Sequence, residues 1–164
     1  MKVYTGVGSR ETPEDIIRTM VKIGKWMGNS GVLLRSGGAD GADSAFERGC
    51  DAVSGRKEIF YSSNNRGTVV EGVYWKEAEK IASEVHPAWD RCNGWARKLH
   101  TRNVFQVMGK DLNSYSDILV CWTKKGGYTG GTATAMRVAD VCGVRIFNLF
   151  FKDHLEELRH ICWK

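Results

Sequence analysis

Two glycine-rich turns constrain the fold of this chain more than any other feature of its sequence. They are Ser36-Gly37-Gly38-Ala39-Asp40-Gly41-Ala42-Asp43 and Tyr128-Thr129-Gly130-Gly131-Thr132. Each lies between a short apolar run, typical of a buried strand, and a longer run with helical periodicity. The order strand, glycine turn, helix is typical of an open α/β sheet, in which such a turn at the carboxyl end of a strand holds a phosphate.

Apolar runs of strand length alternate along the chain with segments of helical periodicity. The runs are residues 3–7, 32–34, 59–61, 118–122 and 144–147. Before the first helical segment, Thr12 is a candidate cap and Pro13 a candidate first helical residue. The pattern predicts an α/β, Rossmann-like fold with a mostly parallel five-stranded sheet and helices on both faces. A length of 164 residues without an internal repeat predicts a single domain.

A third glycine segment, Thr5-Gly6-Val7-Gly8-Ser9-Arg10, follows the first apolar run and adds a hydroxyl and a guanidinium suited to a phosphate. Backbone N–H groups in such turns approach an anion closely, and a following helix adds the positive end of its dipole. Asp40 and Asp43 have a second interpretation, as a helix cap and a first-turn carboxylate. The ligand-binding residues predicted in the three turns are Gly8, Ser9, Arg10, Ser36, Gly37, Gly38, Ala39, Asp40, Asp43, Thr129, Gly130, Gly131 and Thr132.

The predicted helix over residues 94–108 has apolar residues at its ends and a strongly polar middle. We expect part of that middle to face the ligand crevice, and we add Arg102 and Asn103 to the predicted ligand-binding residues. Trp122, at the end of the fourth apolar run, either stacks on a base or belongs to the core. Trp95 borders a predicted loop that either covers the pocket or packs elsewhere.

Composition excludes several classes of protein. With 42% hydrophobic and 26% charged residues the chain is that of a globular protein, and no apolar run approaches the roughly 20 residues of a membrane span, so we expect a cytoplasmic protein without a membrane partner. The net charge of +5 suits an anionic partner or a plain solvated surface. Lys124-Lys125 is the only notable basic doublet near a predicted turn, which argues against extended nucleic acid.

The five cysteines are widely spread, without a C-x-x-C pair or a His at zinc-ligand spacing. We therefore expect reduced thiols and predict neither a metal nor a cofactor.

The three glycine segments together resemble the SLOG superfamily over about residues 3–148. The matching motifs are Gly8-Ser9-Arg10, the turn from Ser36 to Asp43, and Gly130-Gly131-Thr132. The superfamily includes the lonely-guy phosphoribohydrolases, the DNA-processing protein A family, and sensor domains of bacterial immune effectors that bind NAD-derived nucleotides. The chain is most similar to the small stand-alone members found in phages and bacteria. This resemblance implies a nucleotide-binding domain that pairs with further copies of itself.

The enzymatic branch of this superfamily provides a test of activity. A lonely-guy enzyme carries an Arg in a Met-His-Glu-Arg-Lys-like helix and a Glu three residues after the Gly-Thr of its second motif. Leu99-His100-Thr101-Arg102-Asn103 resembles the first element, which places Arg102 at the arginine position. The second element differs from the pattern of the lonely-guy enzymes, because Ala135 occupies the position of the glutamate. Cleavage of a glycosidic bond needs a carboxylate, so the resemblance favours binding over catalysis.

Three functions follow as expectations. The first is binding of a nucleotide or an ADP-ribose-like, NAD-derived or cyclic ligand, as a sensor or a sequestering sponge. The second is a nucleotide N-glycosidase in which another acid, such as Asp40 or Asp43, replaces the missing Glu. The third is binding of single-stranded DNA in the manner of DNA-processing protein A.

Overall fold

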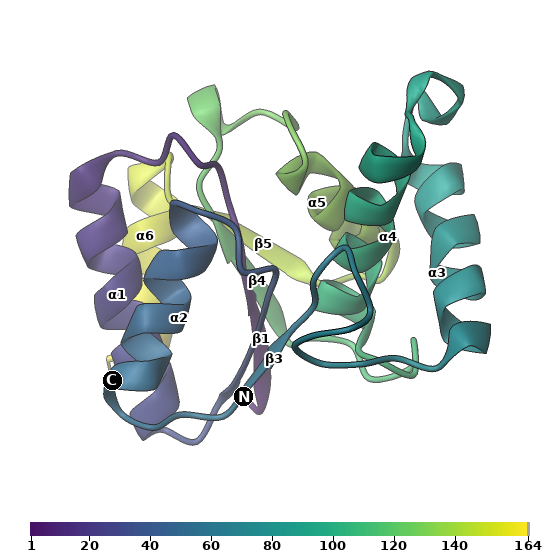
Figure 1. The fold of residues 1–164 in the computed structure, drawn as a ribbon. Coiled ribbons are helices and arrows are strands. Elements are labelled where there is room, and N and C mark those ends of the chain that lie inside the picture. The colour runs from purple at the N-terminus through teal and green to yellow at the C-terminus, as the bar shows by residue number, and fades with distance from the viewer. Residues whose placement is uncertain (164) are drawn as a thin grey trace.

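The computed structural model describes residues 1–163 and contains one five-stranded parallel sheet (Figure 1). The strands are β1 (Val3–Gly6), β2 (Leu33–Ser36), β3 (Lys57–Ile59), β4 (Ile118–Cys121) and β5 (Arg145–Asn148), in the spatial order β3-β2-β1-β4-β5. The helices are α1 (Glu14–Asn29), α2 (Ala42–Ala52), α3 (Gly72–Val85), α4 (Gly94–Met108), α5 (Thr132–Val141) and α6 (Lys152–Cys162), with short 3₁₀ turns η1 (Trp89–Arg91) and η2 (Lys124–Gly126). The Rossmann-like α/β architecture predicted from the sequence is confirmed.

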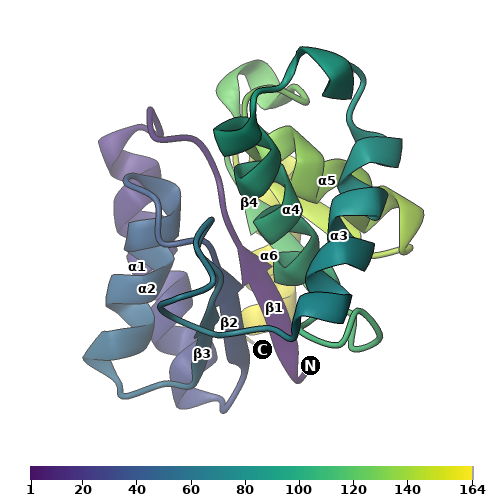
Figure 2. The same cartoon turned by 45° about the vertical axis from the view of Figure 1, so that its right-hand side comes forward.

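Helices cover both faces of the sheet. Figures 1 and 2 show α1, α2 and α6 on one side of the strands and α3, α4 and α5 on the other. Each strand contributes side chains to two separate cores, because successive side chains of a strand point to opposite faces of the sheet. In β4, Ile118 and Val120 pack with the first group of helices, whereas Leu119 and Cys121 pack with the second. A strand buried on both faces explains why this run of sequence is continuously apolar.

The helix pair α1 and α2 packs with close backbone contact. A Cβ atom at Gly24 would lie 2.5 Å from the carbonyl oxygen of Phe46, and a Cβ at Gly49 would collide with the carbonyl oxygen of Val21. Glycine at both positions therefore lets the two helices approach. The start of α2 lies against the loop that follows β1, where the Ala42 N–H donates to the carbonyl oxygen of Ser9 at 3.3 Å.

Two local predictions from the sequence are wrong. The third strand begins two residues earlier than its apolar run, at Lys57, because β3 is an edge strand that tolerates the polar residues Lys57 and Glu58. Phe60 lies beyond the strand and owes its burial to the α4 layer, where its ring stacks on Phe105 at 5.7 Å. Thr12 does not cap α1: the cap position is Pro13, and the Thr12 hydroxyl donates to the carbonyl oxygen of Ser9 at 2.7 Å.

Within residues 1–163, no helix combines the length and the apolar character that crossing a bilayer requires.

Candidate ligand pocket

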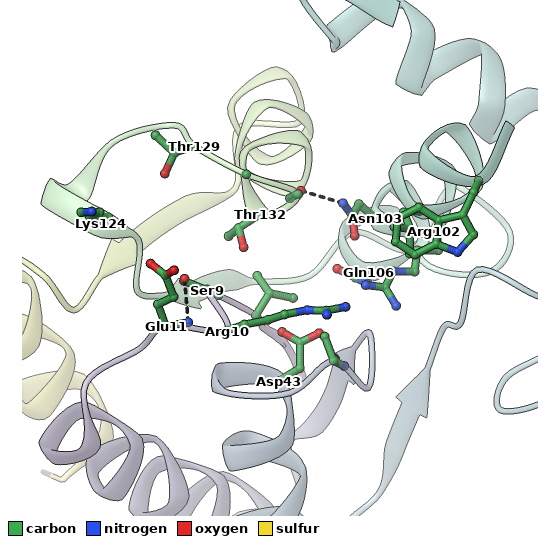
Figure 3. A pocket seen from close by; sticks show the side chains of 17 residues that line it. Ser9, Arg10, Glu11, Asp43, Arg102, Asn103, Gln106, Lys124, Thr129 and Thr132 are labelled. Carbon is green, nitrogen blue, oxygen red and sulfur yellow. Dashed lines mark hydrogen bonds between the residues drawn. The ribbon is translucent and has the colours of Figure 1, made fainter. Parts of the chain in front are cut away.

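A cavity of about 550 Å³ opens beyond the carboxyl ends of β1 and β4. The strand order changes direction between these two neighbours, and open α/β sheets bind their ligands at such a switch point. The walls come from the loops after β1 and β2, from one face of α4, and from the segment between β4 and α5 (Figure 3). The lining residues are Val7, Gly8, Ser9, Arg10, Glu11, Ala39, Asp43, Trp95, Leu99, Arg102, Asn103, Gln106, Lys124, Thr129, Gly130, Gly131 and Thr132.

The buried carboxyl group of Asp43 lies at the floor of this pocket. Its Oδ2 accepts a hydrogen bond from the Ala39 N–H at 3.4 Å. Burial raises the pKa of Asp43 to about 6, against the opposing effects of the Arg102 guanidinium and the N–H groups of Ala39, Gly8 and Gly37. Donors of the first glycine turn therefore already face a carboxyl group of the same chain. This arrangement makes the first turn a poor phosphate cradle, contrary to the expectation from its glycines.

Two long polar side chains of α4 continue the floor. Arg102 donates through Nη1 to the carbonyl oxygen of Gly37 at 2.7 Å, while its buried Nε has no partner among the described residues. The side chain of Gln106 is 1% exposed, and neither its Oε1 nor its Nε2 has a partner among residues 1–163. Buried polar groups are normally paired, and leaving one unpaired costs about 1–3 kcal/mol. Both residues line the pocket, but these atoms are buried beneath its floor, so a ligand pairs them only when the two side chains move.

The second glycine turn forms the opposite end of the pocket and begins α5. Gly130 has a φ of +63°, which glycine adopts without strain. The backbone N–H groups of Gly130 and Gly131 have no hydrogen-bond acceptor among residues 1–163. Asn103 of α4 donates through Nδ2 to the carbonyl oxygen of Gly131 at 2.7 Å and holds the turn from behind (Figure 3). The side chains of Arg10 and Lys124 add positive charge at the same pocket. Free N–H groups at a helix start in the same pocket as the Lys124 ammonium favour an anion, whereas the Arg10 guanidinium extends toward Asp43 and Arg102 (Figure 3).

The structure brings together most of the residues that the sequence predicted for ligand binding. Those that line the pocket are Gly8, Ser9, Arg10, Ala39, Asp43, Arg102, Asn103, Thr129, Gly130, Gly131 and Thr132. Those that do not are Ser36, Gly37, Gly38, Asp40 and Trp122.

Ser36 and Gly38 shape the first glycine turn and do not line the pocket. The buried Ser36 hydroxyl donates to the carbonyl oxygen of Gly6 at 2.6 Å, which ties β2 to β1. Gly38 has a φ of +69°, and a Cβ there would lie 2.5 Å from the ring of Tyr61. Gly37 does not line the pocket, but its carbonyl oxygen accepts the hydrogen bond from the pocket residue Arg102.

Asp40 and Trp122 also lie outside the lining. Asp40 is exposed, and it does not cap α2, whose cap position is Gly41 without a side-chain hydrogen bond. Trp122 is half-buried beside the α1–α2–α6 core, with its ring 6.5 Å from that of Phe150. This position agrees with the second of the two predicted roles of Trp122, as a residue of the core.

Other lining residues were not among the predicted ligand-binding residues. Leu99 and Gln106 lie one helical turn to either side of Arg102 and Asn103, so the periodicity of α4 indicates them once its direction is known. The carboxylate of Glu11 carried no signal, because it lies in an irregular loop. Trp95 and Lys124 are lining residues too, from the predicted loop and the basic doublet.

Searches against protein-family models, curated proteins and solved structures found no match to this chain. The resemblance to the SLOG superfamily stays a prediction from the motifs. Of the two positions that distinguish its enzymatic branch, Arg102 lines the pocket, and Ala135 is fully buried among α3, α4 and α5. The carboxyl groups at the pocket belong to Asp43 and Glu11.

Proposed function

We propose that this protein binds a nucleotide or an ADP-ribose-like ligand in the pocket, as a sensor or as a protein that sequesters a nucleotide signal. One observation carries the proposal: a single cavity has an anion-binding helix start at one end and an unpaired polar floor at the other. A phosphorylated sugar with a base presents this same polarity, with charge at one end and neutral hydrogen-bonding groups at the other.

The phosphate end of the proposed complex is the start of α5. The N–H groups of Gly130 and Gly131 have no acceptor among residues 1–163, and a Cβ at either position would meet no atom within 4 Å, so there is open space beside both residues. Lys124 adds a flexible ammonium at this end, whereas the forked donors of Arg10 extend toward Asp43 and Arg102 at the other end (Figure 3). The hydroxyl groups of Ser9 and Thr132 supply further donors for phosphate oxygens.

The sugar and base end is the floor formed by Asp43, Arg102 and Gln106. An ionised carboxylate accepts hydrogen bonds from vicinal sugar hydroxyls, and a primary amide both donates and accepts, as the edge of a base requires. Leu99 and Trp95 add apolar surface on the α4 side, and such surface suits the face of a planar base. The unpaired amide of Gln106 makes this end selective, because a ligand without matching groups leaves it unsatisfied.

A nucleotide N-glycosidase is the second candidate, and the state of Asp43 favours it. A carboxyl group whose pKa is raised to about 6 by burial exchanges protons near neutral pH, as a general acid or base must. Glu11 gives a second carboxylate at the same pocket, as glycoside cleavage commonly uses. In this case Asp43 takes over the role of the glutamate that Ala135 replaces.

We also propose that the protein forms a homo-oligomer in which a second copy covers the pocket. Trp95 lines the pocket with 64% of its surface exposed, and an indole so placed gains burial when a neighbour packs on it. Light scattering coupled to gel filtration tests this, with Trp95→Ala expected to shift the species towards the monomer. A monomeric parent protein, or an unchanged mass for Trp95→Ala, would contradict this arrangement.

Native mass spectrometry with a ligand panel tests the proposed function. The purified protein is incubated with AMP, cyclic nucleotides, NAD and ADP-ribose, and the mass of each complex and of the free ligand is recorded. We expect one intact ligand per pocket for at least one member of the panel. Release of free base with ribose phosphate would establish the glycosidase instead, and Asp43→Asn should then abolish release while retaining binding. Neither binding nor release across the panel would refute both candidates.

A further inference from the structure

The joint between α3 and α4 brings together three side chains that the sequence did not associate. His86 directly follows α3, Cys92 follows η1, and His100 lies in the first half of α4. One ligand-type atom from each lies within 4.8 Å of the other two. Their spacing matches no short zinc motif, which is why the sequence predicted reduced thiols and no metal.

The distances within this cluster approach those of a metal centre. The Sγ of Cys92 lies 3.7 Å from Nε2 and 4.0 Å from Nδ1 of His86, and the rings of His86 and His100 have centroids 4.3 Å apart. Two ligands bonded to one tetrahedral zinc ion are separated by roughly 3.3–3.8 Å, given bonds of about 2.0–2.3 Å. Small side-chain rotations therefore bring all three donors onto one ion.

A hydrogen bond from outside the cluster orients His100. The Nδ1 atom of His100 lies 2.8 Å from the Oγ1 of Thr134, a fully buried residue of α5. When Nδ1–H donates to this hydroxyl, the lone pair resides on Nε2, and metal-bound histidines are typically held in this way through their second nitrogen. The imidazole is thus oriented from behind with one nitrogen available.

We propose that His86, Cys92 and His100 form a binding site for a zinc-class divalent ion. One thiolate and two imidazoles are borderline-soft donors that select zinc over magnesium or calcium, and three protein ligands leave a fourth position for water. On binding, the Cys92 thiol loses its proton to solvent and gives up its contact with the carbonyl oxygen of Ala88 at 3.6 Å. The ion takes Nδ1 of His86 in exchange for the Ala88 N–H, which donates to that atom at 3.0 Å.

Access and charge both bear on this site. A surface hollow lined by His86, Trp89 and other residues of the α3–α4 connection reaches one of the three donors, and all three are half-buried. The Arg137 guanidinium is close enough to act on both imidazoles, so it opposes a cation while the thiolate attracts one.

Metal binding here would act on the pocket through α4. His100 lies two residues before Arg102 on the same helix, and both Arg102 and Asn103 line the pocket. An ion that links α4 to the end of α3 would hold the start of α4 in place. The site is independent of the identity of the pocket ligand.

Cobalt titration tests the proposal directly. Reduced protein, freed of metal by a chelator and desalted, is titrated with Co²⁺, and the thiolate-to-cobalt charge-transfer band and the visible bands of tetrahedral cobalt are recorded. We expect saturation at one equivalent and displacement by equimolar Zn²⁺. Cys92→Ser should lose the charge-transfer band, and His100→Gln should weaken cobalt binding at least tenfold. Cys142→Ser, which alters another half-buried cysteine outside the cluster, should behave as the parent protein.

The absence of both cobalt bands in the parent protein would overturn the proposal. Equal loss of the charge-transfer band in Cys142→Ser and Cys92→Ser would also overturn it, because cobalt would then be binding thiols unselectively. Circular dichroism controls for folding of each variant. Should Cys92→Ser fail to fold, unaltered cobalt binding by a folded His100→Gln would be equally decisive against the site.

Discussion

Gly131 is the residue at which the proposed phosphate site can be tested without disturbing the fold. Its φ of −64° and ψ of −31° suit any residue, and a Cβ there would meet no atom within 4 Å. We expect Gly131→Val to unfold at the temperature of the parent protein while its side chain obstructs the approach to the start of α5. Ligand affinity should fall about tenfold or more, equivalent to at least about 1.4 kcal/mol, as measured by isothermal titration calorimetry.

Gly72→Val is the matched control for this experiment. Gly72 also has open space around a Cβ, but it begins α3 away from the pocket. Equal ligand affinity in Gly131→Val and Gly72→Val would contradict the phosphate site at α5. Gly38 does not serve this purpose, because a side chain there collides with Tyr61 in a backbone conformation that favours glycine.

Asp43 gives the stability of the protein a characteristic dependence on pH. Its pKa rises on folding from 3.8 to about 6, so folding favours the protonated form. Its contribution is most favourable below pH 4, declines as the pH rises to about 6, and is constant above. Asp43→Asn should therefore gain stability relative to the parent protein across this window, by up to about 3 kcal/mol.

Urea unfolding of both proteins at several pH values measures this difference, because the other carboxyl groups contribute equally to each. A difference in unfolding free energy that does not change between pH 4 and 7 would show that Asp43 titrates normally.

At the scale of elements, the contact between α1 and α2 depends on the absence of side chains. A Cβ at Gly49 would collide with the carbonyl oxygen of Val21, an atom of helix backbone that cannot move by itself. We expect Gly49→Ala to destabilise the protein by about 1–3 kcal/mol in chemical unfolding, despite the higher helix propensity of alanine. Gly72→Ala, which meets no neighbour, should be neutral within about 0.5 kcal/mol. Equal stability of the two variants would mean that the helices separate easily.

The elements themselves were largely predictable from the sequence, because apolar periodicity reports which face of each is buried. The predicted helix over residues 94–108 coincides with α4, and β4 follows from its continuous apolar run. The predicted position of β3 was two residues too late, since the polar residues Lys57 and Glu58 gave no strand signal and Phe60 is apolar because it packs on Phe105 beyond the strand. From the polar middle of α4, Arg102 and Asn103 line the pocket.

The arrangement within the pocket could not be predicted from residue types alone. Asp43 faces the N–H group of Gly37 in its own turn and that of Gly8, which is distant in sequence, and no local pattern reveals the pairing with Gly8. The cluster of His86, Cys92 and His100 depends likewise on how the α3–α4 connection folds. Tertiary contacts, rather than local propensity, decide both arrangements.

For the whole molecule, the dependence of binding on salt separates a small ligand from a nucleic acid. The net charge of +5 and the cations at the pocket would attract either. A mononucleotide engages its phosphate at one place, so we expect affinity to fall about tenfold or less between 50 and 200 mM salt, whereas a strand contacting several phosphates would lose about a thousandfold or more. Fluorescence anisotropy with labelled nucleotide and labelled single-stranded DNA gives both slopes. A steep slope with tight DNA binding would favour the DNA-processing alternative over the nucleotide.

At Gln106 the proposed function and the stability of the fold make opposite demands. Its buried amide is unpaired within the described chain, so Gln106→Met should fold more stably while losing the group that we propose for ligand recognition. Variants recovered by screening for heat resistance alone would therefore accumulate apolar residues at this position and become robust but inactive. Retention of glutamine among natural variants would, in turn, be a signature of selection for the ligand rather than for the fold.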